Sequence, residues 1–306
     1  MNIVIPILLG IGPILILIGI LYLFRIIKRR KKLRAPFTQD LLRGPGQSLF
    51  AKLDAINEDL MVYLLVALLM PLAIYSTHIS LSYFWSVPEN EFRIGAAALV
   101  GIGFFVFSIY KVIKLLNKRR WIRLGYEGEL VVGQELDQLM QDGFNVYHDF
   151  QANKFNIDHI VVGAKGVFAV ETKARSKPTT KNRVDDATVE YDGRMLSFPK
   201  GNDFKTIDQA KRQASWLSNW LGKAIGEPIA ARAVVALPGW LVKRSSAEGI
   251  SVVNPKQFSA LFEHIKPRSL SESMITRINH QLDQRCRDVQ PPSKNFDSPN
   301  STLDVK

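Results

Sequence analysis

Two carboxylates and a lysine lie within one short stretch, D-H-I-V-V-G-A-K-G-V-F-A-V-E-T-K, which runs from Asp158 to Lys173. Two apolar, β-branched runs flank its glycine-containing turn, a pattern typical of a β-hairpin. If Gly163 pairs with Gly166, counting outward places Asp158 opposite Glu171, where like charges destabilise a sheet unless a cation lies between them. Glu171 and Lys173 share a face because side chains alternate along a strand. This arrangement suits metal-assisted phosphodiester hydrolysis, in which carboxylates hold Mg²⁺ and a lysine positions a water or stabilises developing charge. A half-buried hairpin with solvated terminal charges is the alternative interpretation.

A third acid is predicted to lie on the helix that precedes the hairpin. From Glu129 onward, helical periodicity places Val132, Leu136 and Leu139 on one face. Glu129 lies on that same apolar face, where a buried carboxylate needs a partner. Alternatively, an acid in the first turn of a helix complements the helix dipole and needs no partner. The sequence leaves both interpretations open.

Strand and helix patterns alternate around these residues. Thr206 and Gln209 match a capping box at the start of one helix. No role is predicted for His148, His159 or the Asp185-Asp186 pair, which we expect to be surface or strand residues. The expected elements are a strand at 145–151, the hairpin, an exposed loop at 174–186, either a short hairpin or a strand end at 191–198, a helix at 206–221, strands at 232–237 and 250–253, and helices at 255–265 and 271–285.

These segments together resemble a known family. G-x-x-G-E on the opening helix, I-D-H-I-V-V-G-x-x-G-V-F-A-V-E-T-K on the hairpin and D-Q-A on a later helix resemble the nuclease-related domain, NERD. The resemblance covers roughly residues 122–240. It implies the PD-(D/E)xK nuclease-like superfamily, and hence an α/β fold with a restriction-endonuclease-like mixed sheet flanked by helices.

The resemblance also implies roles for individual residues. It makes Glu129, Asp158 and Glu171 the ligands of Mg²⁺ or Mn²⁺, and it makes Asp158, Glu171 and Lys173 the catalytic set. Gln209 resembles an accessory helix glutamine often found near such sites, an interpretation that competes with its capping-box role. Ile157 stands where the superfamily pattern has proline, at a position that tolerates apolar residues.

Three apolar segments are predicted to cross a membrane before this domain. Basic residues follow the first and third segments and remain on the cytoplasmic side, which places the N-terminus outside and the later domain inside. The first segment lacks the basic start and small-residue site of a signal peptide, so we expect a retained anchor. The predicted regions are transmembrane helices at 1–24, 60–79 and 94–116, a basic cytoplasmic loop at 25–59, a short external loop at 80–93, the nuclease-like domain with C-terminal helices at 121–286, and a disordered tail at 287–306.

The formal charge of +12 is unevenly distributed. Residues 1–120 carry 15 Lys and Arg against 6 Asp and Glu, whereas residues 121–306 carry 25 against 22. Most of the basicity therefore belongs to the membrane flanks, where it also suits anionic lipid. Lone Cys286 excludes an internal disulfide.

These features predict a multi-pass protein of the plasma (inner) membrane. Its cytoplasmic domain is expected to be a metal-dependent nuclease acting on nucleic acid, with DNA favoured over RNA and the lipid bilayer as the second partner. The alternatives are a non-cleaving nucleic-acid-binding or signalling module and a membrane scaffold. Intact acids favour the nuclease, whereas the nearly balanced charge favours the scaffold. Local basicity beside the predicted site comes from Lys173, Arg175, Lys177, Lys181 and Arg183.

Overall fold

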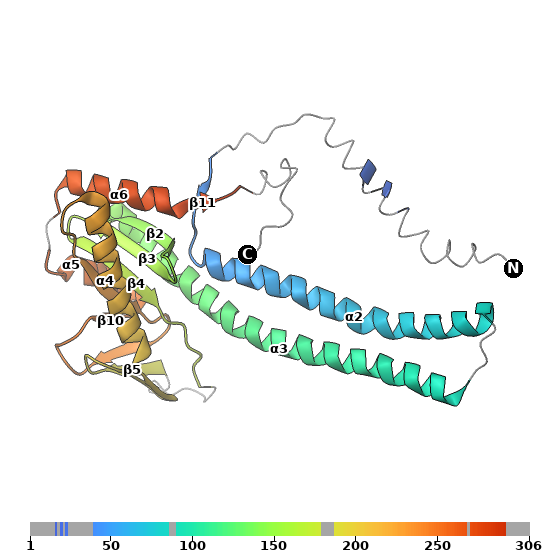
Figure 1. Ribbon diagram of the computed structural model, residues 1–306. Helices are drawn as coiled ribbons and strands as arrows, with labels where there is room; N and C mark the ends of the chain where they lie inside the picture. The colour runs from blue at the N-terminus through green and yellow to red at the C-terminus, as the bar shows by residue number, and fades with distance from the viewer. Residues whose placement is uncertain are drawn as a thin grey trace. The chain divides into compact units, whose positions relative to one another are not determined.

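The computed structural model describes most of the chain, and its contacts divide it into two compact units (Figure 1). The first includes Met61–Val112, and the second consists of Asp40–Leu60 together with Ile113–Val289. The predicted membrane segment at 1–24 lies outside the described residues apart from five isolated positions. The described residues are 39–85, 90–178, 187–267 and 270–291, with 16, 19, 20, 22 and 23.

The described chain has two long helices with extended apolar stretches. They are α2 (Gln47–Trp85) and α3 (Glu91–Asp137). Both are long and apolar enough to cross a membrane. The core helix of a soluble protein meets the same criterion but is mostly buried, whereas only 6% and 11% of the most apolar stretches are buried here. Within the first unit, the Tyr63 and Phe107 rings lie 6.3 Å apart.

Several predicted boundaries in this region are wrong. The loop expected at 25–59 includes the start of α2, which begins at Gln47 and continues past Pro71. The loop expected at 80–93 is shorter, because α2 reaches Trp85 and α3 begins at Glu91. Such long helices tolerate an internal proline where neighbouring groups satisfy the freed backbone.

The helices expected at 94–116 and from Glu129 are one continuous helix, α3. The intervening stretch includes three arginines, one lysine and one leucine, which are strong helix formers, and its two glycines, at roughly 1 kcal/mol each, do not end the helix. One of them, Gly128, allows close approach of another segment. A Cβ there would lie 2.5 Å from the Ala174 side chain.

A five-stranded mixed sheet forms the centre of the second unit, in the order β10-β8-β4-β3-β2. The pairs β2–β3 and β3–β4 are antiparallel, and β4–β8 and β8–β10 are parallel. The predicted strand and hairpin are confirmed, with the turn where Gly163 pairs with Gly166. The strands are β2 (Asn145–Gln151), β3 (Asn156–Gly163), β4 (Gly166–Thr172), β8 (Ala231–Ala236) and β10 (Ser251–Val253).

A smaller sheet of four strands has the order β7-β6-β5-β9. Of the two interpretations of residues 191–198, the short hairpin is confirmed, because β5 and β6 form an antiparallel pair. Buried Trp240 and Phe198 meet edge to face, with their ring centroids 4.9 Å apart. The strands are β5 (Thr188–Tyr191), β6 (Leu196–Phe198), β7 (Gly201–Asp203) and β9 (Leu241–Arg244).

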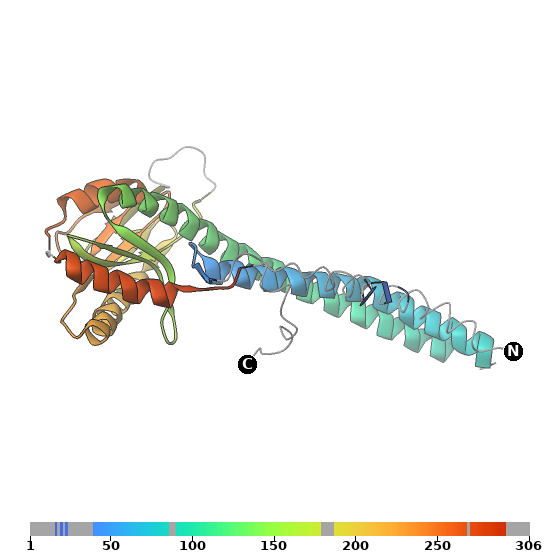
Figure 2. The same cartoon turned by 90° about the horizontal axis from the view of Figure 1, so that it is seen from above.

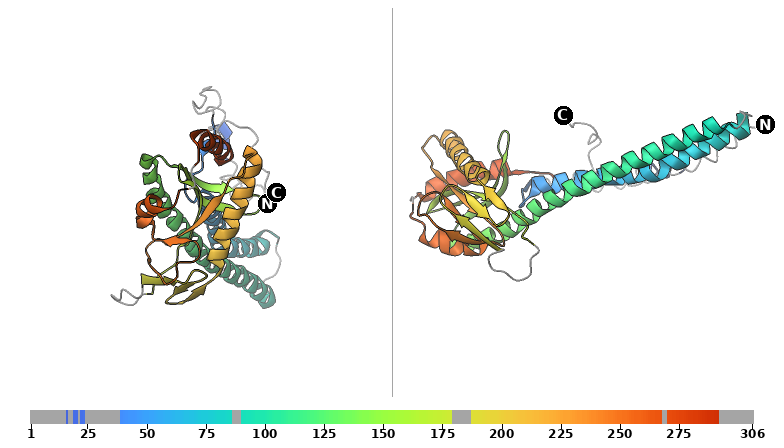
Figure 3. Two further views of the ribbon diagram at one scale, coloured as in Figure 1. Left: turned by 90° about the vertical axis from the view of Figure 1, so that its left-hand side faces the viewer. Right: turned by 90° about the horizontal axis from the view of Figure 1, so that it is seen from below.

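Helices cover both faces of the five-stranded sheet (Figure 3). On one face, α4 (Lys205–Ile225) and α6 (Glu272–Cys286) pack against alternate strand residues such as Ile160 and Ala169. On the other face, the end of α3 and α5 (Phe258–His264) pack against Val161 and Phe168. Alternation of side chains along the strands thus builds two cores from one hairpin.

The two ends of the second unit meet in a short strand pair. β1 (Leu41–Leu42) runs antiparallel to β11 (Arg287–Val289), and α6 leads directly into β11 (Figure 2). The tail predicted from residue 287 therefore begins with a strand. Residues 292–306 lie outside the described part.

We expect Phe168→Ala to reduce the free energy of unfolding by about 3–5 kcal/mol, because it leaves a cavity against the Phe262 ring, whose centroid lies 4.8 Å away. Phe204→Ala is the matched control, since that ring is 57% exposed. Denaturant unfolding of the full chain in detergent, followed by tryptophan fluorescence, measures both. Equal losses would contradict the packing described here.

Candidate active site

The hairpin brings Asp158 and Glu171 to the same end of the sheet. Five residue pairs from Gly163↔Gly166 to His159↔Val170 fix the register. One further step places Asp158 opposite Glu171, on the face that α4 covers. Both are buried, with exposed fractions of 7% and 5%. The Asp158 carboxylate (Oδ2) accepts a hydrogen bond from the Thr172 backbone N–H at 2.8 Å.

Two glutamines of α4 hold the Glu171 carboxylate. Gln209 donates to Oε1 at 2.8 Å and Gln213 donates to Oε2 at 2.7 Å. The capping-box interpretation of Gln209 is wrong, because α4 has no side-chain cap and the Thr206 hydroxyl donates to Asp203 instead. Gln213 was missed by sequence reasoning. Its signal is its spacing, because residues four apart share a helix face.

Glu129 reaches the same region from α3. Its exposed fraction is 6%, and its Oε2 atom has no hydrogen-bond partner. The Gly46 backbone lies beside it, because a Cβ at Gly46 would lie 3.6 Å from the Glu129 Cβ. The helix-dipole interpretation is wrong, because α3 begins far upstream at Glu91 and dipole effects act within the first turn.

Lys173 follows β4 immediately, and its backbone N–H donates to the Ala236 carbonyl at 2.9 Å. Its Nζ lies 3.8 Å from Asp203 Oδ2, and the side chain is 39% exposed. In the predicted basic cluster, Arg175 lies over the Phe198 ring and Lys177 over the Trp240 ring. The other two members of that cluster, at 181 and 183, lie outside the described residues.

Burial shifts the titration of all three acids in the same direction. It raises the pKa of Glu129 to about 9, reinforced by the negative charges of Asp158 and Asp149. It raises the pKa of Asp158 well above its usual range, reinforced by Glu171. It raises the pKa of Glu171 to about 7, against the opposing effects of Gln213 and Lys173. Carboxylates crowded in this way favour either protons or a bound cation.

The two histidines without a predicted role are buried. His148 Nδ1 lies 2.8 Å from His159 Nδ1, and His148 Nε2 lies 3.0 Å from Asp137. His159 Nε2 lies 3.1 Å from the Thr172 hydroxyl. Burial holds the pKa of His159 well below its usual value, so the ring is neutral. This row of polar contacts, from Asp137 through the two histidines to Thr172, supports the end of β4 from the face opposite Glu171.

Asp149 is a fourth buried acid, which sequence reasoning did not single out. Its backbone has a φ of +47°, in the left-handed region, between the paired residues His148 and Phe150. Its Oδ2 accepts from Arg43 at 2.7 Å and its Oδ1 from Asn156 at 2.8 Å. No periodic pattern marks such a residue, because all residues of β2 from Val146 to Phe150 are buried and the strand shows no polar–apolar alternation.

The described side chains do not form a ready-made metal centre. Among residues 39–85, 90–178, 187–267 and 270–291, no three His, Cys, Asp or Glu side chains converge closely enough to hold an ion. The structure places Glu129, Asp158 and Glu171 near one another without closing them around one point.

A mixed sheet flanked by helices, with buried acids at one strand end, defines an α/β protein and is consistent with a nuclease-like fold. Residues 124–238 match the family model described as the nuclease-related domain, NERD. The chain therefore contains a NERD domain, and the resemblance drawn from the sequence motifs is confirmed. No curated protein and no solved structure matches the chain. The match covers neither residues 40–60 nor the helices after residue 238.

In the presence of a chelator, we expect stability to fall as the pH rises from about 5 to about 9. Glu129 ionises near pH 4.5 when unfolded and near 9 when folded, so between these values the folded state binds more protons and unfolding is favoured by rising pH. The slope approaches about 1.4 kcal/mol per pH unit for each such group.

Glu129→Gln is expected to reduce the fall of stability per pH unit by the contribution of one titrating group. Glu263→Gln, at an exposed position on α5, is the control. Thermal unfolding of the full chain in detergent across this pH range tests it. A parent whose stability rises steadily to pH 9 would contradict the assignment of buried, crowded acids.

Proposed function

We propose that the NERD domain hydrolyses phosphodiester bonds of nucleic acid with the help of a divalent cation. The observation that carries the proposal is the burial of three neighbouring carboxylates, Glu129, Asp158 and Glu171, beside a partly exposed lysine. Burying like charges together is unfavourable unless protons or a cation compensate them. The nuclease-related family suggests nucleic-acid binding, and the mixed sheet suits the restriction-endonuclease-like fold that the family implies.

The donor atoms fit Mg²⁺ or Mn²⁺. All three groups offer carboxylate oxygens, which these cations prefer. Glu129 Oε2 is buried without a partner. Each ionised carboxylate oxygen has two lone pairs, so Glu171 can accept its glutamine hydrogen bonds and still bind a cation. Because the groups do not yet converge on one point, binding includes a local adjustment of these side chains.

The residues of the chain would then divide the work. When bound, the cation supplies positive charge near the phosphate and lowers the pKa of the attacking water. Lys173 orients that water or stabilises the charge that develops on the phosphate. Gln209 and Gln213 keep Glu171 in one rotamer. The Thr172 N–H does the same for Asp158. DNA is favoured over RNA as the substrate.

A non-cleaving nucleic-acid-binding or signalling module is the second candidate. It is favoured by one observation, that both Glu171 oxygens are already engaged by amides in the described state. The same fold supports either function. Cleavage by the parent protein would decide between them.

We further propose that α2 and α3 anchor the protein in the plasma membrane, with the NERD domain on the cytoplasmic side. Residues 40–60 and 113–289 flank the two apolar stretches and belong to one compact unit, so both must lie on the same side of the membrane. In this arrangement α2 crosses the membrane away from that side, and α3 crosses back to it. The basic residues at 25–34 and 111–123 favour the cytoplasm for that side.

For the chemistry, we expect Mg²⁺ or Mn²⁺ to raise the melting temperature of the full chain, because a ligand that binds only the folded state stabilises it. At a hundred times the Kd, this amounts to about 2.7 kcal/mol. Glu171→Gln should abolish both this shift and cleavage, because it removes a ligand charge. Lys173→Met should keep the shift and lose cleavage, because the lysine acts on the water. Glu190→Gln, at an exposed position of β5, should change neither.

Thermal unfolding with and without the cation, and cleavage of single- and double-stranded DNA and RNA, are the measurements. Cleavage that survives both site substitutions would place the chemistry elsewhere in the chain. A cation-induced shift without cleavage of any nucleic acid would favour the non-cleaving module.

For the topology, single-cysteine labelling exploits the buried position of Cys286. A membrane-impermeant maleimide added to intact expressing cells should label Asn90→Cys, between α2 and α3. It should label Lys154→Cys, on the β2–β3 turn, only after permeabilisation. Labelling of Lys154→Cys in intact cells would refute the proposed orientation.

A further inference from the structure

The end of β4 carries Glu171 and Thr172, and it is held toward β3 by side chains. The residue pairs between the two strands end at His159↔Val170, whereas β4 stays paired with β8 as far as Thr172. Beyond that last pair, two consecutive residues of β3 reach Thr172. Asp158 Oδ2 accepts from its backbone N–H at 2.8 Å, and His159 Nε2 lies 3.1 Å from its hydroxyl. Thr172 therefore links the acid site to His159.

From Thr172 the row of polar contacts leads to the surface. His159 Nδ1 lies 2.8 Å from His148 Nδ1, and His148 Nε2 lies 3.0 Å from Asp137 Oδ1 at the end of α3. The two rings meet edge to face, and both histidines are buried. The Asp137 side chain is 46% exposed. All four ring nitrogens thus have a partner, and each partner constrains where a proton can lie.

The carboxylate at the outer end gives the row a direction. An ionised carboxylate can only accept, so His148 Nε2 donates to Asp137. A neutral imidazole has one N–H and one acceptor nitrogen. His148 Nδ1 therefore accepts, and His159 Nδ1 donates to it. His159 Nε2 is then an acceptor, and the Thr172 hydroxyl donates to it. With neutral rings, these contacts leave one arrangement of protons.

We propose that His159, as its Nδ1–H tautomer, is a positioning residue of the acid site. Its unprotonated Nε2 fixes the Thr172 side chain, and thereby the Thr172 N–H that holds Asp158. Asp137 selects this tautomer through His148. Without the acceptor at His159, the buried hydroxyl would lose its partner and the end of β4 would be held less firmly. The consequence for cation binding rests on the proposed function, whereas the tautomer and the contact do not.

The tautomer can be read from nitrogen NMR of the full chain, labelled with ¹⁵N-histidine and reconstituted in nanodiscs. At about pH 8.5, above the range in which histidines usually take up protons, His159 should carry its proton on Nδ1. Asp137→Ala should raise the ratio of the Nε2–H to the Nδ1–H form about ten-fold, the size of losing a hydrogen bond to a charged group. Asp142→Ala, at an exposed position five residues further along, is the control. A parent His159 protonated on Nε2, or a ratio that Asp137→Ala does not change, would overturn the proposal.

Hydrogen exchange tests the contact without a cation. The Thr172 amide should exchange about ten-fold faster in His159→Leu. The Lys173 amide, which donates to the Ala236 carbonyl on the β8 side, should keep its rate. His159→Gln should restore slow exchange of Thr172, because its side-chain oxygen can accept from the hydroxyl. An unchanged Thr172 rate in His159→Leu, or an equal increase at both amides, would overturn the proposal.

Cation binding connects the contact to the proposed function. His159→Leu is expected to raise the Kd for Mn²⁺ about ten-fold in calorimetry, and His159→Gln to leave it near the parent value. In a Thr172→Val background, His159→Leu should change the Kd no further, because its effect passes through the hydroxyl. Additive losses in the double variant would overturn the proposal. If the tautomer and exchange results hold but the parent binds no Mn²⁺, the positioning contact stands and the proposed cation fails.

Discussion

The burial of three carboxylates at one end of a β-sheet is the constraint on which the rest of this structure depends. Desolvation is the largest influence on the pKa of Glu129, Asp158 and Glu171 alike. A charge taken out of water needs donors or counter-charges. The chain supplies them from four places: the β4 backbone, the α4 glutamines, Lys173 and Lys52 of α2. No single element can satisfy the site, which explains why strands and both helix layers meet there.

The local part of this arrangement was predictable from the sequence. Two glycines three residues apart fixed the hairpin register, and a period of two then decided which side chains share a face. Gly143, with a φ of +80°, ends the helical stretch at a position that favours glycine. The motifs on the opening helix, the hairpin and α4 together carried the resemblance to the family, which the match at residues 124–238 confirms.

The long-range part was not predictable. Gln213 and Asp149 act through partners that lie 42 and 106 residues away in the sequence, and neither helical nor strand periodicity encodes such contacts. The His148–His159 pair reads as two isolated polar residues until β2 and β3 are placed side by side. The start of α2 was taken for loop because its first turns are polar, although they pack onto the nuclease-related unit. Pattern alone also divided α3 in two at its basic stretch.

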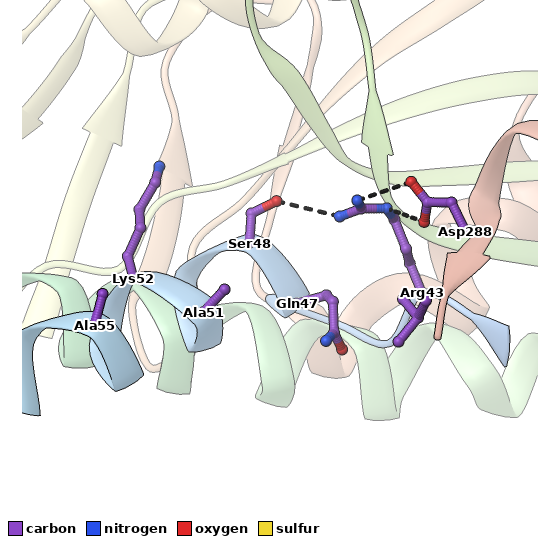
Figure 4. A pocket seen from close by; sticks show the side chains of 8 residues that line it. Arg43, Gln47, Ser48, Ala51, Lys52, Ala55 and Asp288 are labelled. Carbon is purple, nitrogen blue, oxygen red and sulfur yellow. Dashed lines mark hydrogen bonds and ion pairs between the residues drawn. The ribbon is translucent and has the colours of Figure 1, made fainter. Parts of the chain in front are cut away.

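The second compact unit, which contains the NERD domain, is interrupted in sequence. Met61–Val112 separates its first part, Asp40–Leu60, from its second part, Ile113–Val289. This sets an order on biosynthesis. About 230 residues separate Leu60 from Val289, the last residue of the unit, which takes roughly 10–50 s at ribosomal speed. Arg43 is synthesised near the start of that interval and its ion-pair partner Asp288 near the end (Figure 4). Both apolar helices are therefore made before the acid site is complete, so the unit reaches its final form only after its candidate anchors have been synthesised.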